Sequence, residues 1–220
     1  MPNETSLSAD AAFEQEFARL MALPLVHGIL QELAQGLPAN LTYHSAAHTV
    51  DVLRETVRFA VYDSVSPRQR ELLALAAAFH DAGFLVQPTD NETIGADRAS
   101  AAMLQDGSFS PEEIQLVRSM ILDTKLDVSG EGVQHPTTPL AGYLLDADLG
   151  NLGRSDFWEK SELYRQELGA PAENFFGTTE ALLERHSYHT PAARVLRNQQ
   201  KRENLSKLRE RRANHSATSE

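Results

Sequence analysis

The 220-residue chain contains no cysteine. That absence excludes disulfides, zinc–thiolate sites, iron–sulfur clusters and cysteine nucleophiles, so any bound metal must be held by His, Asp or Glu. The chain also lacks an apolar run near the roughly 20 residues that span a bilayer. Its N-terminus, MPNETSLSAD, lacks the basic and apolar regions of a secretory signal. We therefore expect a soluble, cytoplasmic protein that makes no membrane contact.

Positive charge is also scarce, because 20 Lys and Arg face 31 Asp and Glu and give a net charge of −11. A chain of this charge is repelled by a nucleic-acid backbone unless it carries a local basic patch. One such run exists at residues 201–212, KRENLSKLRERR, but no aromatic side chains interleave with it to stack bases. Its cations suit the negative end of a helix dipole. We therefore expect a solvated helix end there, with contact to nucleic acid as the alternative.

The sequence shows neither strand-like alternation nor an internal repeat, and its apolar residues recur at helical spacing. This pattern predicts an all-α fold, a helical bundle of one domain over residues 9–205. Residues 1–8 are predicted to be a flexible N-terminus and residues 206–220 a basic helix end with a loose tail. Helices are predicted over 10–35 with a break at Pro24, over 45–61 and 67–82, from Asn91, from Ser110-Pro111, from Leu140 to Asp148, after Ser155, over 173–185, and from Thr190-Pro191, with a loop at 128–139.

Four short stretches place histidines and carboxylates within this apolar helical pattern. Taken singly, each has an ordinary interpretation as a surface, capping or packing feature. Taken together on one helical chain they favour a divalent-metal site, because imidazole and carboxylate suit zinc, iron, manganese and similar ions and a helix bundle can bring them together. The stretches are YHSAAHTVDV with His44 and His48, AFHDAGF with His80 and Asp81, DNETIGA with Glu92, and LLDADLGNLG with Asp146 and Asp148.

The order of these stretches resembles the HD-domain superfamily of metal-dependent phosphohydrolases. YHSAAHTVDV is similar to the Tyr-His-Asn-x-x-His-x-x-Asp-Val signature of the cyclic nucleotide phosphodiesterases in that superfamily. The DNETIGA, DADLGNLG, RSDFWEKSELYRQELG and HSYHTPAARVLRNQQKRENL segments resemble the small bacterial HD phosphohydrolases, so the resemblance covers about residues 40–205.

The resemblance implies a set of metal ligands, namely His48, His80, Asp81 and Asp148. Asp148 is preferred to Asp146 because the family's ligand directly follows Ala and precedes Leu or Arg. Asp146 would then help to orient the ligands without binding the metal itself. The ion implied is divalent, and Mn, Fe, Zn, Mg, Co and Ni are not distinguished. Phe84 stands where the phosphodiesterases carry a further histidine for a second metal, which argues against a second site here.

The resemblance also implies catalytic roles for His44, Glu92 and Asp81. His44 would be the general acid at the leaving oxygen, and Glu92 would act as a base or orient water. Thr124 and Lys125 form a Thr-Lys pair that resembles one in the bacterial group. Lys125 is therefore a candidate contact to a substrate phosphate. Tyr43 could line the site, or it could pack against the first turn of the following helix as a hydrophobic staple.

The implied activity is hydrolysis of a phosphoester bond in a nucleotide or related small phosphate compound, with metal-bound hydroxide as the nucleophile. Two alternatives stay open. One is a nucleoside triphosphate pyrophosphohydrolase of the same fold, and the other is a module that senses nucleotides without turning them over. The sequence leaves open whether the protein forms a homo-oligomer.

Overall fold

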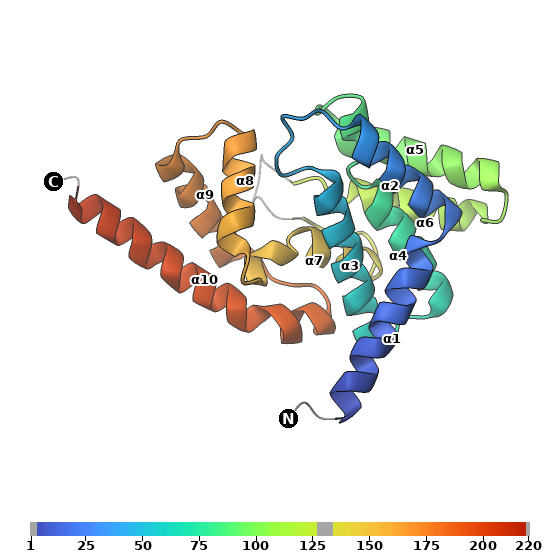
Figure 1. The fold of residues 1–220 in the computed structure, drawn as a ribbon, viewed down its shortest axis with the longest axis horizontal. Helices are drawn as coiled ribbons and strands as arrows, with labels where there is room; N and C mark the ends of the chain where they lie inside the picture. Colours follow the sequence, from blue (N-terminus) through green and yellow to red (C-terminus); the bar gives the residue numbers. More distant parts are fainter. Residues whose placement is uncertain (1–3, 127–133, 219–220) are drawn as a thin grey trace.

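The computed structural model describes residues 4–126 and 134–218, and all regular structure in this part of the chain is helical (Figure 1). The all-α prediction is confirmed, and the helices form a single compact domain. Their bounds are α1 Glu4–Met21, α2 Pro24–Gly36, α3 Ala46–Tyr62, α4 Pro67–Phe79, α5 Asn91–Asp106, α6 Pro111–Leu122, α7 Ala141–Asp148, α8 Phe157–Glu167, α9 Ala172–Arg185 and α10 Pro191–Thr218, with 3₁₀ helices η1 Ala82–Leu85 and η2 Gly150–Gly153.

Several helices begin at capping residues that the sequence predicts. Ser110 and Glu113 form a reciprocal capping box at the start of α6, as SPEE predicts. Ser45 caps α3 by accepting a hydrogen bond from the His48 backbone N–H. The predicted Ser155 cap is wrong by one residue, because Asp156 occupies the cap position of α8 and its carboxylate pairs with Arg154.

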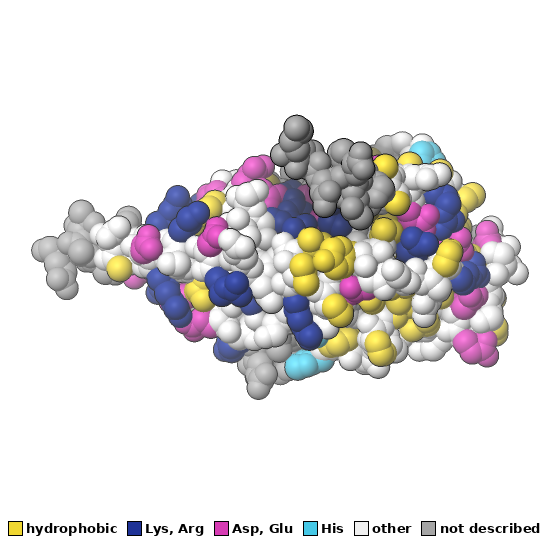
Figure 2. Space-filling model, turned by 90° about the horizontal axis from the view of Figure 1, so that it is seen from below, with side chains coloured by type: hydrophobic (Ala, Val, Ile, Leu, Met, Phe, Trp, Pro, Cys, Tyr) yellow, Lys and Arg dark blue, Asp and Glu magenta, His cyan; other side chains and the backbone are white. Residues whose placement is uncertain are grey.

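Both chain ends are more helical than the sequence predicts. Helix α1 begins at Glu4, within the segment expected to be flexible, and α10 continues to Thr218. The extension of α10 has a physical cause, since Arg209 and Arg212 both pair with Glu180 of α9. The basic run therefore contacts acids of this chain, and positive and negative side chains mix along the arm at the left of Figure 2. None of the described helices is long and apolar enough to cross a membrane.

Helix α4 lies at the centre of the larger hydrophobic core, and every residue from Leu72 to Phe79 in it is buried. Its run of small alanines allows α3, α5, α6 and α2 to approach from several sides. A second, smaller cluster of Leu152, Phe157, Leu183 and Leu208 joins η2 and α8 to α9 and α10, at the left of Figure 1. The C-terminal ends of α4 and α7 and the start of α3 belong to the larger cluster through Phe79, Ala147 and Ala46.

Two glycines allow the start of α5 to approach the turn after α4. A Cβ added at Gly95 would lie 2.5 Å from the Phe79 carbonyl oxygen, and one added at Gly83 would lie 2.1 Å from the Asn91 carbonyl oxygen. Both obstacles are backbone atoms, which cannot move aside as a flexible side chain can. The backbone around His80 and Asp81 is therefore fixed by contacts that only glycine permits.

We predict that Gly95→Ala destabilises the protein by about 1–3 kcal/mol, because the new methyl group must displace the backbone of α4. Gly28→Ala in α2 is the matched control, since no atom lies within 4 Å of its added Cβ. Alanine has the better helix propensity, so the control should stabilise by ~0.5–1 kcal/mol. Urea unfolding midpoints measure both changes, and equal shifts in the two variants would contradict the packing argument.

Candidate metal centre

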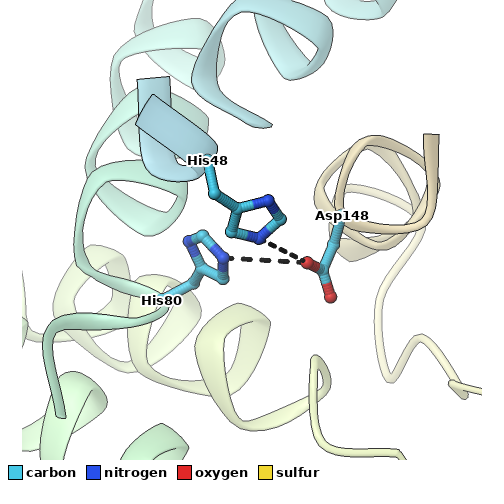
Figure 3. A group of neighbouring side chains, drawn as sticks. All are labelled: His48, His80 and Asp148. Carbon is cyan, nitrogen blue, oxygen red and sulfur yellow. Dashed lines mark ion pairs between the residues drawn. The ribbon is translucent and has the colours of Figure 1, made fainter. Parts of the chain in front are cut away.

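Three helices each contribute to one group of polar side chains, of which His48, His80 and Asp81 are buried and Asp148 is half-buried. His48 comes from the first turn of α3, His80 and Asp81 follow directly on α4, and Asp148 is the last residue of α7. Figure 3 shows the two imidazoles turned toward the Asp148 carboxylate. Segments separated by about a hundred residues in sequence therefore meet at one point.

The distances within this group suit a bound cation. The Nε2 atoms of His48 and His80 lie 3.5 Å and 3.7 Å from Asp148 Oδ1. Ligands placed ~2.1 Å from a common ion would be about 3.0–3.4 Å apart, so little adjustment is needed. Ligand atoms of His48, His80 and Asp148 all lie within 4.8 Å of one another, and this group could hold a metal ion. Asp81 Oδ2 contacts the same imidazoles, 3.1 Å from His80 Nε2 and 3.5 Å from His48 Nε2.

Polar atoms of this group are buried without a hydrogen-bond partner. They are His48 Nε2, His80 Nε2 and Asp81 Oδ2, and each nitrogen faces the Asp81 oxygen at ion-pair distance but not in hydrogen-bond geometry. Buried polar atoms are rarely left unpaired, because each costs ~1–3 kcal/mol of desolvation. A divalent cation would satisfy all three at once, so the donor set fits a metal of the kind that His and Asp bind.

Neighbouring groups hold the candidate ligands in orientation. The Ala77 carbonyl oxygen accepts a hydrogen bond from His80 Nδ1 at 2.8 Å, which leaves Nε2 facing the centre. The Gln134 side-chain amide donates to Asp148 Oδ2 at 2.7 Å, and the Asn91 side-chain amide donates to Asp81 Oδ1 at 3.4 Å. In each carboxylate, one oxygen accepts a hydrogen bond from a side-chain amide, and the other oxygen faces the histidines.

Charge compensation sets the protonation of the group when no metal is present. Burial lowers the pKa of His80, but the adjacent Asp81 carboxylate outweighs burial and Asp148 adds to it, so the pKa rises to about 9. Burial raises the pKa of Asp81, but His80 together with His44 and His48 outweighs burial and holds that pKa far below its usual range. The pKa of Asp148 is likewise lowered, because His48 and His80 outweigh its burial.

Asp146 faces away from this group, although it lies only two residues before Asp148. Its carboxylate accepts hydrogen bonds from the backbone N–H groups of His189 and Thr190 and from the Thr190 hydroxyl, each at 2.7 Å. Two residues apart on a helix point about 200° apart, which explains the separation. Asp146 therefore fixes the start of α10 behind the metal group.

His44 lies beside the group and is anchored by Glu167, the last residue of α8. The Glu167 carboxylate pairs with His44 Nδ1 and accepts the backbone N–H groups of Tyr43 and His44 at 2.8 Å and 3.0 Å. Burial lowers the pKa of His44, but Glu167 and the nearby Asp81 outweigh burial and raise it. With Nδ1 engaged, Nε2 is the nitrogen left for other contacts.

A cavity of about 410 Å³ opens beside these residues, and Leu152 of the smaller hydrophobic cluster lines it. Tyr43, His44 and Asp148 line one part of it, and Tyr164 and Phe175 line another. The rings of Tyr43 and Tyr164 are 5.0 Å apart and those of Tyr164 and Phe175 are 5.9 Å apart, so aromatic surface is continuous along one wall. Tyr43, a candidate site residue from the sequence, is thus part of the cavity wall.

For two residues predicted to act at the site, Glu92 and Lys125, the contacts to the ligand group and the cavity come from their chain neighbours. Glu92 is half-buried in the first turn of α5, and the contact to Asp81 comes from its neighbour Asn91. Lys125 is exposed and lies 3.4 Å from Asp90 of the same surface, while Leu126 lines the cavity instead. The rings of Phe84 and His44 stack with their centroids 4.6 Å apart. Phe84 stands at the sequence position where the phosphodiesterases carry a histidine for a second metal.

Some residues of the site carry no recognisable sequence signal. Glu167 stands in a solvated-looking helix, and Gln134 in a segment predicted to be a loop. Residues 128–133 of that predicted loop lie outside the described residues. Only their tertiary contacts identify these two side chains. Asn91 could have been found, because it directly precedes Glu92 in the motif already singled out.

Comparison with known proteins gives no family for this chain. No protein-family model matches it, and neither a curated protein nor a solved structure is significantly similar to it. The helical fold and the His and Asp group are compatible with an HD-type fold.

We predict that metal affinity rises with pH between about 6.5 and 9. A pKa of about 9 keeps His80 protonated at neutral pH in the metal-free protein, and a cation must displace that proton. The stabilising effect of protonated His80 is therefore complete below about pH 6.5 and is lost as pH rises through about 9, while metal affinity changes in the opposite sense.

Calorimetric titration with Mn²⁺ at several pH values measures this dependence, and repeating it in buffers of different ionisation enthalpy counts the protons released. We expect up to about a tenfold gain in affinity per pH unit. His80→Ala should lose binding, whereas His27→Ala, which removes an exposed histidine of α2, should not. An affinity independent of pH would contradict the displacement of a proton from His80.

Proposed function

We propose that this protein is an HD-type hydrolase that cleaves a phosphoester bond in a nucleotide or related small phosphate compound with the help of a divalent cation. The observation that carries the proposal is the convergence of His48, His80, Asp81 and Asp148 with unpaired buried ligand atoms, directly beside a cavity of about 410 Å³. The order of the four motifs in the sequence supports the same assignment.

In this proposal the two imidazoles and the two carboxylates hold the cation. A divalent ion in such a site acts as a Lewis acid on a phosphoryl oxygen and lowers the pKa of water toward ~7. The protein supplies the fixed arrangement of ligands, held by Ala77, Asn91 and Gln134. One ligand group of this composition within the described residues, with Phe84 stacked on the neighbouring His44 ring, favours a single ion.

His44 is the proposed proton donor to the departing oxygen. It lines the cavity, and Glu167 fixes its Nδ1, so Nε2 is free to face a bound ester. An imidazole is well suited to this task near neutral pH. Glu167 is then a positioning residue, since it acts through His44 and through the backbone of the turn before α3.

The cavity favours an organic phosphate over inorganic polyphosphate. Its wall combines the rings of Tyr43, Tyr164 and Phe175 with leucines, which suits an apolar or aromatic moiety such as a nucleobase. Ser161 adds a hydroxyl group for hydrogen bonds to that moiety, and the hydroxyls of Thr178 and Thr179, which donate to the Phe175 carbonyl oxygen, can accept from it. The base itself is not specified by these contacts.

We predict that the purified protein hydrolyses bis(p-nitrophenyl) phosphate when Mn²⁺ is added. Asp81→Ala should lose both bound metal and turnover, because it removes a carboxylate oxygen from the centre of the group. Asp97→Ala is the control, since it removes an exposed carboxylate of α5 that pairs with Arg118. Elemental analysis and release of p-nitrophenol measure the two effects.

Two results would count against parts of this proposal. Unchanged metal content in Asp81→Ala would remove Asp81 from the ligand set. Bound metal without turnover of this ester or of any nucleotide would favour a module that senses nucleotides through the same site.

We further predict that His44→Ala keeps its metal but slows turnover by about 10²–10⁴-fold on esters with poor leaving groups. p-Nitrophenolate leaves without protonation, so the loss on p-nitrophenyl esters should be much smaller. His27→Ala again serves as the control. Steady-state rates on alkyl and aryl esters of the same phosphate test this, and an equal loss on both would contradict the role of His44 as an acid.

A further inference from the structure

A second, smaller hollow of about 130 Å³ lies next to the metal group. Its lining includes Gln134, His135, Arg185, His186 and His189. Gln134 donates a hydrogen bond to Asp148, and Leu149, which directly follows Asp148, lines both this hollow and the larger cavity. The two spaces therefore adjoin at the end of α7.

The chemistry of the smaller hollow is that of an anion site. Its described lining offers a guanidinium, imidazoles, an amide and a hydroxyl, and contains no Asp or Glu among those residues. This is unusual in a chain with a net charge of −11. Behind the lining, the buried ammonium of Lys201 donates to His186 Nδ1 at 3.2 Å. Burial and this ammonium lower the pKa of His186 to about 3, so the ring stays neutral while Lys201 adds positive potential.

Arg185 is the cation best placed to contact a ligand. It is the last residue of α9 and lines both the small hollow and the large cavity. Its guanidinium is exposed, and no hydrogen bond or ion pair joins it to another described residue. The neighbouring arginines of α10 differ in this respect, because Arg209 and Arg212 are paired with acids of α9.

We propose that the small hollow binds a second phosphate group of the substrate, one that is not attacked, and that Arg185 is its principal contact. This inference rests on the proposed function and names a substrate class for it, namely nucleotides with at least two phosphates. The large cavity takes the nucleoside, the metal group takes the phosphoester to be cleaved, and the hollow takes the remaining phosphate.

The volumes and charges are consistent with this division. A hollow of about 130 Å³ is far larger than the ~10–15 Å³ that a single water needs by the same measure. Arginine presents a planar fork of donors that matches phosphate oxygens, so it holds such a group in a defined position. Gln134 lines the hollow, and its side-chain amide donates a hydrogen bond to Asp148 Oδ2. The Gln134 side chain therefore separates an anion bound in the hollow from the negative charge of Asp148.

The test is a comparison of ligands that differ by one phosphate. Calorimetric titrations of the Mn²⁺-loaded protein would use AMP, ADP and adenosine 3′,5′-bisphosphate, the last two carrying the extra phosphate at different positions. We expect at least one of them to bind about tenfold more tightly than AMP, as charge-assisted hydrogen bonds allow. In Arg185→Gln this preference should fall to within about twofold.

Arg202→Gln is the matched control, because it removes the same charge from an exposed position on α10 that lines neither space. It should keep the wild-type preference. The proposal is overturned if Arg185→Gln keeps the preference as well, or if the wild type shows none. A protein that turns over no phosphoester, yet shows the preference and loses it in Arg185→Gln, would sustain the anion site and overturn the proposed hydrolysis alone.

Discussion

Two carboxylates, the buried Asp81 and the half-buried Asp148, meet two imidazoles at the ends of α3, α4 and α7, and the rest of the structure depends on that meeting. Asp81 and Asp148 would repel one another strongly in a dry interior. They are tolerated because the imidazoles of His48 and His80 lie 3.1–3.7 Å from their oxygens, and the raised pKa of His80 gives that ring a compensating positive charge. Removing one partner would leave an uncompensated charge behind, a change that typically costs 3–5 kcal/mol. The surrounding helices must therefore hold four side chains at fixed spacing.

The chain meets that requirement mainly with small residues. Alanines make α4 narrow enough for several helices to surround it, and Gly83 and Gly95 bring the backbone of α5 against the turn that carries His80 and Asp81. Asn91 reaches Asp81 only because of that close approach. A well-packed interior resists small displacements, so the ligand spacing follows from the packing of the backbone rather than from the ligands themselves.

Much of this arrangement could be predicted from the sequence, for identifiable reasons. Helix starts at Pro24, Pro67, Pro111 and Pro191 are local signals, and they agree with the structure within a residue or so. The metal group also has local signals, because each histidine or aspartate stands in its own short motif. Contacts between distant segments have no such signal. The positions of Glu167, Gln134 and Arg185 depend on how α8, α9 and the segment before α7 fold around His44, Asp148 and the cavity, which no spacing in the sequence records.

The division of the core into two clusters bears on how a ligand could enter. The metal group is attached to the larger cluster, whereas the far wall of the cavity comes from α8 and α9, which the cluster of Leu152, Phe157, Leu183 and Leu208 supports. A segment with few buried apolar contacts opens at lower free energy than the main core. Opening of α8 would also break the Glu167 contacts that hold His44. The proposed acid would then be oriented only when the cavity wall is in place, while the metal ligands on α3, α4 and α7 would remain undisturbed.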